Sequence, residues 1–129
     1  MTSSVENSRP PLTVLSEEEE LFRAAVLELA ESEVRPRVRD MENAGKLDPA
    51  VTAKFVELGL MGIEVPEQFG GADGTLMMVT LAVEALSTID AAAAIQVDVQ
   101  NTLVNYPINR YGNAEQHTRF LSRLTSGTI

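Results

Sequence analysis

Apolar residues recur at helical spacing in the first third of the chain. Over residues 21–41 they fall three to five positions apart, which places them along one stripe of a helix. Ser16 with Glu19 three residues later has the signature of a capping box that starts this helix. Pro36 removes a backbone donor, so we expect a kink there and a left-handed glycine cap at Gly45.

The same periodicity predicts further helices after this one. Asp48-Pro49 is a helix start, because aspartate is a favoured N-cap and proline suits the first helical position. Tyr106-Pro107 is expected to interrupt or restart a later helix. The remaining helices are expected over residues 49–58, 75–88, 91–105, 107–111 and 113–124. Five or six helices with short connections and no credible sheet predict an all-α, up-and-down helical bundle.

Glycines cluster between the second and third predicted helices. Residues 63–66 are expected to be short and extended, and Gly70, Gly71 and Gly74 mark a turn-rich loop after them. A phosphate-cradling role for Gly70-Gly71 is the functional alternative. The pattern G-x-G-x-x-G is absent and no proper strand precedes the loop, so the turn is the favoured interpretation.

Composition narrows the classes of function. The 129 residues include 10 Lys+Arg and 19 Asp+Glu, a net charge of −9, which argues against nucleic acid or an anionic membrane surface as the main partner. The absence of cysteine excludes disulfides, thiolate nucleophiles and cysteine–zinc sites, and one histidine excludes multi-histidine metal sites. The acidic run at residues 17–20 is interpreted as a first turn matched to the helix dipole, so no metal site is expected.

Residues 1–14 are rich in serine, threonine and proline, and we expect a flexible segment there, followed by one helical domain over 15–129. This segment lacks the apolar region of a secretory signal and the arginines of a transit peptide. No apolar run approaches the roughly 20 residues of a membrane span. A soluble intracellular protein, located in the cytoplasm, is the resulting expectation.

Catalytic chemistry is sparse in this sequence. The single histidine, His117, is expected on the polar surface of the last helix, and the helical carboxylates are expected to be solvated. One helix is unusual: residues 95–105 combine an apolar stripe at Ile95, Val99 and Leu103 with uncharged amides and hydroxyls. Such a helix is either buried on most sides or lines a cavity.

Several short segments, in order, resemble the N-terminal helical domain of the acyl-CoA dehydrogenase family over about residues 15–127. They are Leu-Ser-Glu-Glu-Glu-Glu-Leu-Phe (15–22), Val-Arg-Pro (34–36), Glu-Leu-Gly-Leu-Met-Gly-Ile-Glu-Val-Pro (57–66), Phe-Gly-Gly (69–71), Glu-Ala-Leu (84–86), Ile-Asp-Ala (89–91), Tyr-Gly-Asn (111–113) and Glu-Gln (115–116). Val-Gln-Asn-Thr-Leu (99–103) looks most like the short/branched-chain members.

The resemblance implies α,β-dehydrogenation of acyl-CoA thioesters with FAD, electron transfer to an electron-transfer flavoprotein, and a homotetramer. It also implies that the middle β-domain and C-terminal helical domain are absent from this chain, together with the catalytic glutamate and nearly all FAD contacts. No catalytic residue is therefore assigned here, and the chain alone is expected to be inactive. The helix matching residues 91–105 would form one wall of the acyl-chain cavity through Gln96, Val99, Gln100 and Leu103.

Two alternatives remain open. Within the superfamily, an acyl-CoA oxidase-like relative would show oxygen reactivity as a complete enzyme. In another class, the chain would be a stand-alone helical interaction module or one subunit of a split enzyme. An exposed apolar patch is the expected signature of missing neighbouring domains.

Overall fold

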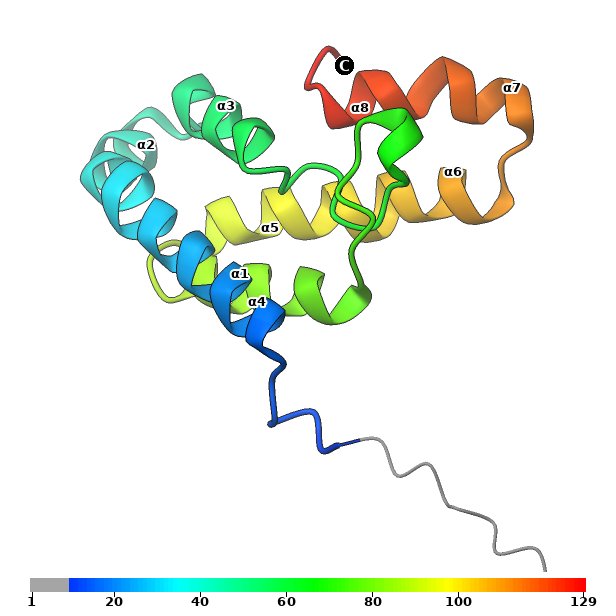
Figure 1. The fold of residues 1–129 in the computed structure, drawn as a ribbon. Coiled ribbons are helices and arrows are strands. Elements are labelled where there is room, and N and C mark those ends of the chain that lie inside the picture. The colour runs from blue at the N-terminus through cyan, green and yellow to red at the C-terminus, as the bar shows by residue number, and fades with distance from the viewer. Residues whose placement is uncertain (1–9) are drawn as a thin grey trace, which may run out of the picture.

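Five continuous helical rods make up the part of the chain that the computed structural model describes, residues 10–129 (Figure 1). No strand occurs within this part, so the predicted all-α, up-and-down bundle is confirmed. Most of the expected flexible segment, residues 1–9, lies outside the described residues. The rods are α1–α2 (17–44), α3 (Pro49–Glu57), α4 (Leu76–Ser87), α5–α6 (91–111) and α7–α8 (114–125).

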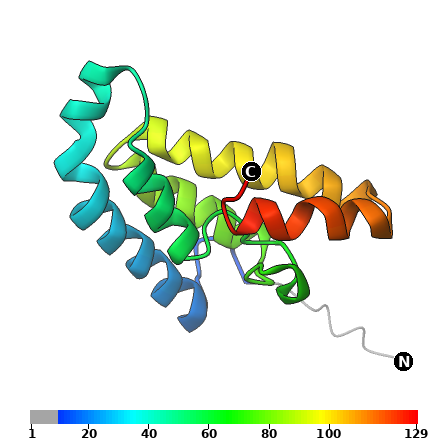
Figure 2. The same ribbon diagram turned by 90° about the horizontal axis from the view of Figure 1, so that it is seen from above.

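The first rod begins and ends where the sequence predicts. Ser16 Oγ accepts from the Glu19 backbone N–H at 3.1 Å, and the Glu19 carboxylate accepts from the Ser16 N–H at 2.9 Å. This capping box precedes α1 (Glu17–Leu29). Around Pro36 the hydrogen-bond pattern changes to π and then 3₁₀ before α2 (Val38–Ala44), and the ribbon bends there (Figure 2). Gly45 ends the rod at φ +67° in the left-handed region.

Removing this cap gives a direct test of the helix start. Ser16→Ala is expected to destabilise the chain by about 1 kcal/mol, because the Glu19 backbone N–H in the first turn loses its side-chain acceptor. Thr80→Ala is the matched control: Thr80 lies on the exposed side of α4 and its hydroxyl bonds back to the Leu76 carbonyl, so stability should hold or rise. Urea unfolding midpoints measure both, and an unchanged midpoint for Ser16→Ala would contradict the capping role.

The core lies where α1, α3, α4 and α5 meet. Val26, Phe55, Leu86 and Val97, one from each of these helices, have no exposed surface. The second rod starts at the predicted aspartate, since Asp48 Oδ1 accepts from the Ala50 N–H at 2.9 Å. α4 and α5 are joined by only three residues and therefore run antiparallel (Figure 1).

The expected interruption at Tyr106-Pro107 is a change of hydrogen-bond pattern and not a break. α5 (Ala91–Val99) passes into a π-helical segment (Gln100–Asn105) and then α6 (Tyr106–Tyr111) with helical dihedral angles throughout. Pro107 is accommodated because its missing N–H falls where the π pattern gives way to the α pattern.

The fifth rod folds back along α5–α6 (Figure 2). It comprises α7 (Ala114–Gln116), a π-helical turn (His117–Leu121) and α8 (Ser122–Thr125). The predicted cap is confirmed, since Asn113 and Gln116 form a second capping box with bonds of 2.9 Å.

The prediction that His117 lies on a polar surface is wrong. Its Nε2 is 2.9 Å from the Ile108 carbonyl oxygen, and its ring meets the Phe69 ring edge-on with centroids 6.0 Å apart. The turn at Gly112 is tight enough to bring this first part of the fifth rod against α6. His117 is therefore a half-buried packing residue that joins two rods.

Candidate functional site

The rod α5–α6 has a buried face that includes two asparagines and an opposite face that exposes large apolar side chains. Its buried face follows a four-residue step through Ala93, Val97, Asn101 and Asn105, all at most 3% exposed. Its outer face carries large apolar side chains that remain exposed: Ile95 59%, Val99 39%, Leu103 69% and Tyr106 46%. Of the two alternatives from the sequence, burial on most sides is thus wrong for this chain. An apolar surface that is open to a ligand or a neighbouring domain remains.

The hydrogen bonds of the two buried asparagine side chains explain why this side of the helix faces the protein interior. Asn101 Oδ1 accepts from the Ile63 backbone N–H at 2.9 Å, and its Nδ2 donates to the carbonyls of Leu60 at 2.7 Å and Val97 at 2.8 Å. Asn105 Nδ2 donates to the Met61 carbonyl at 2.7 Å. Backbone groups of the turn after α3 are therefore satisfied only when these two side chains point inward.

The four residues predicted from the family resemblance lie along one side of the rod, as their spacing requires. Val99 and Leu103 are exposed, whereas Gln96 and Gln100 are half-buried. Gln96 Nε2 donates to Thr52 Oγ1 of α3 at 2.9 Å, and Gln100 Nε2 donates to Asn105 Oδ1 at 3.3 Å. The two amides are held by the protein itself, and the apolar side chains between them stay free for contact.

Gln96 faces a hollow of its own. That hollow, about 540 Å³ in volume, lies between α3, the end of α8 and Gln96. Val99 and Leu103 do not line it. The structure therefore groups the four predicted residues along one helix side without placing them around one enclosed cavity.

Sequence reasoning missed Asn101 and Asn105 as individual residues. It treated the amides of this helix as a group and did not predict which of them face the protein interior. A usable signal was present, because the two asparagines continue the four-residue step of the small apolar residues Ala93 and Val97. Asparagines that continue a buried apolar series at four-residue spacing indicate a helix face that hydrogen-bonds to backbone groups.

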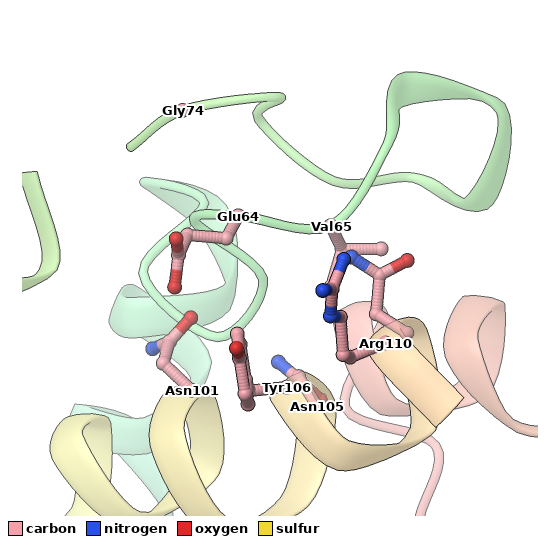
Figure 3. Close-up of a pocket in the computed structure, with 8 residues that line it drawn as sticks. Glu64, Val65, Gly74, Asn101, Asn105, Tyr106 and Arg110 are labelled. Carbon is pink, nitrogen blue, oxygen red and sulfur yellow. The ribbon is translucent and has the colours of Figure 1, made fainter. Parts of the chain in front are cut away.

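A second, polar hollow of about 280 Å³ lies beneath the turn after α3 (Figure 3). Glu64 and Asn101 extend into it from opposite elements, and Tyr106 and Arg110 line its α6 side. Burial raises the pKa of the Glu64 carboxyl above its usual range. Glu64 is the one carboxyl among the residues that line this hollow, and nothing in its lining points to a reacting group, so no catalytic role is assigned to it.

The glycine loop is a self-contained turn. The backbone N–H groups of residues 70–74 all donate to carbonyls of the chain itself, at 2.7–3.2 Å. A Cβ on Gly71 would overlap the Val65 carbonyl oxygen. These amides are not free to bind a phosphate, so the turn interpretation is confirmed and the residues of this loop do not fit the pyrophosphate of a flavin dinucleotide.

Residues 10–129 contain no group of three or more His, Asp or Glu side chains arranged to hold a metal ion. None of the helices in this part of the chain is long and apolar enough to cross a membrane.

The chain is similar in sequence to short/branched chain specific acyl-CoA dehydrogenases. The chain is 40% identical over 119 residues to a probable short/branched chain specific acyl-CoA dehydrogenase of Dictyostelium discoideum, which covers 92% of this chain and 29% of the relative. It is 34% identical over 116 residues to the mitochondrial short/branched chain specific acyl-CoA dehydrogenase of Bos taurus, covering 90% and 27%. The chain thus spans less than a third of the length of these relatives.

Solved structures of butyryl-CoA and glutaryl-CoA dehydrogenases share the fold of this chain. Butyryl-CoA dehydrogenase of Megasphaera elsdenii superposes with a TM-score of 0.81 at 28% identity, over 89% of this chain and 31% of that one. A glutaryl-CoA dehydrogenase of Mycobacterium smegmatis, described in complex with FADH2, gives 0.81 at 27% identity over 88% and 29%. The model of the acyl-CoA dehydrogenase N-terminal domain matches residues 16–128. Since the family model covers residues 16–128 and the solved structures share the fold, the chain belongs to the acyl-CoA dehydrogenase family as an N-terminal domain.

Proposed function

We propose that this chain is the N-terminal domain of a flavin-dependent dehydrogenase of short or branched-chain acyl-CoA thioesters and forms one wall of the acyl-chain cavity. The observation that carries the proposal is the exposed apolar side of α5–α6, where Ile95, Val99 and Leu103 remain open to solvent. Contiguous apolar side chains on an outer face mark a surface that another apolar group covers. The 40% identity to a short/branched-chain relative supports the substrate class.

Contact with an apolar tail is the chemistry that these residues offer. Val99 and Leu103 present branched aliphatic groups, and each methylene that they bury contributes about 0.8 kcal/mol. Gln96 and Gln100 lie on the same side of the helix, and their NH2 groups donate to Thr52 and Asn105 within the protein, so neither donor needs the tail as a partner. The wall therefore selects by shape and length.

Bond-making groups are assigned to the parts of the relatives that this chain does not span. The amides of the glycine loop are bonded within the chain, and the polar hollow at Glu64 shows no reacting group, so the proposal gives this chain no catalytic and no FAD-binding residue. FAD, an electron-transfer flavoprotein as acceptor and a homotetrameric assembly belong to the proposal at the level of the whole enzyme. A similar structure, with a TM-score of 0.83, is titled as the electron transferring flavoprotein of Acidaminococcus fermentans.

An assay of two polypeptides tests the function. The full-length product of the gene, purified with FAD, is expected to oxidise butyryl-CoA and 2-methylbutyryl-CoA with an artificial electron acceptor. The 129-residue chain with added FAD is expected to show no activity above the flavin blank, because it holds no base. Turnover by the short chain alone would contradict this division of labour.

The same assay separates the rival functions. An acyl-CoA oxidase-like enzyme would consume oxygen at a rate comparable to that with the artificial acceptor. An interaction module or a split-enzyme subunit also fits an exposed apolar side. It would be favoured if the gene product were inactive by itself and became active only with a second polypeptide.

A further inference from the structure

The register of α5–α6 departs from what an α-helix gives. With 3.6 residues per turn, each four-residue step rotates by about 40°, so the positions 93, 97, 101 and 105 would spread over about 120° of an ideal helix. All four lie on the buried face. The π-helical segment Gln100–Asn105 narrows this spread, because its wider turn rotates less per residue and offsets part of the drift.

The two asparagines sit within this segment and hold it. Asn101 is its second residue and Asn105 its last, and together they bond Leu60, Met61 and Ile63 of the turn after α3. The partners are backbone groups of a segment distant in sequence, so an apolar side chain in either position would leave buried N–H or C=O groups unpaired. These hydrogen bonds therefore favour one rotation of the rod about its own axis over other rotations.

The opposite side of the rod is fixed by the same bonds. Val99 and Leu103 stand two residues before Asn101 and Asn105, which directs them away from the buried face. Gln100 adds a direct link, since its amide bonds the Asn105 side chain. A rotation of the rod would therefore move the proposed wall and the asparagines together.

We propose that Asn101 and Asn105 are positioning residues that set the rotation of α5–α6 and, through Val99 and Leu103, the tail length that the cavity accepts. This inference rests on the proposed function for its second half only. The first half, the rotation, is a property of the chain that can be measured without any substrate.

Thiol labelling measures the rotation, since the chain has no cysteine of its own. Leu103→Cys places a probe on the outer face and Val97→Cys one on the buried face. Adding Asn101→Leu is expected to slow labelling of the outer thiol at least threefold and to speed labelling of the buried thiol at least tenfold. Asn105→Ala, which removes a single backbone bond, is expected to shift both rates in the same directions by less.

A core variant separates rotation from simple loss of stability. Phe55→Leu lies in the core on α3, where general destabilisation speeds labelling of the buried thiol and leaves the outer one unchanged. Should Asn101→Leu fail to fold by circular dichroism, Asn105→Ala decides alone. An unchanged outer rate in the folded asparagine variants, matching the Phe55→Leu result, would overturn the proposal.

Substrate profiles of the full-length enzyme test the second half. Asn101→Leu and Asn105→Ala are expected to change the ratio of kcat/KM between butyryl-CoA and octanoyl-CoA at least fivefold. Val99→Trp serves as the reference for the wall itself. If it alters this ratio and the asparagine variants do not, the positioning role is overturned while the proposed function stands. If Val99→Trp leaves the ratio unchanged, the wall assignment fails instead.

Discussion

Gly71→Ala is expected to cost the chain about 3 kcal/mol of stability or more, a large fraction of the roughly 5–15 kcal/mol that holds a typical domain folded. The new Cβ would overlap the Val65 carbonyl oxygen and crowd the Val65 Cβ as well. Backbone atoms cannot rotate away as a side-chain end can. The clash would force apart residues 62–65 and 71–74, whose backbone bonds close the loop. Urea unfolding followed by circular dichroism measures the loss.

Gly45→Ala is the matched control for this prediction. Gly45 lies at φ +67°, and nothing stands within 4 Å of an added Cβ. Only the left-handed backbone conformation opposes the substitution, at a cost of about 1–2 kcal/mol. Equal losses for the two variants would contradict the close approach of Gly71 to Val65 as the source of a larger cost.

Val99→Trp in the full-length enzyme is expected to lower kcat/KM for octanoyl-CoA at least a hundredfold and to leave that for butyryl-CoA within threefold. Val99 projects from the exposed side of α5–α6, so the larger ring should fill the far end of the proposed cavity without disturbing the buried face. A ratio of this size corresponds to about 2.7 kcal/mol of lost tail contact, or three to four methylenes. Steady-state kinetics over a series of acyl lengths measures it.

Val99→Ala should act in the opposite direction and improve the longer tails. Equal losses for all tails in Val99→Trp would point to misfolding or to a different wall. Circular dichroism of the same preparations distinguishes these two causes, because a misplaced wall leaves the helical signal intact.

Local signals in the sequence predicted the ends of helices well. The Ser16 box, the Asp48 cap and the Gly45 terminus act within one helical turn, so neighbouring residues carry the whole of the information. The Asn113–Gln116 box belongs to the same class. Such features depend little on what the rest of the chain packs against.

Predictions that depended on distant contacts were less successful. His117 becomes a packing residue because a tight turn brings it to Ile108 and Phe69, which the periodicity of the last helix does not reveal. Pro107 interrupts nothing because a π-helical segment precedes it. In both cases tertiary geometry overrode a sound local rule.

At the candidate site, too, the sequence located the helix but did not reveal its contacts with distant residues. The family resemblance selected the helix and the side of it that is exposed, but the pattern of residues 95–105 left open whether the helix is buried on most sides or lines a cavity. Asn101 and Asn105 determine which side is buried, because the turn after α3 presents backbone donors and acceptors and not an apolar surface. A polar residue pairs with such groups better than leucine does.

Photocrosslinking tests most directly whether this helix forms the wall of the acyl cavity. An acyl-CoA of medium length with a diazirine at the end of its tail would be bound to the full-length enzyme, irradiated, and the labelled residues located by mass spectrometry. The account predicts labels on Val99 and Leu103 that an excess of butyryl-CoA removes. Labels confined to other segments, with none between residues 95 and 106, would contradict it.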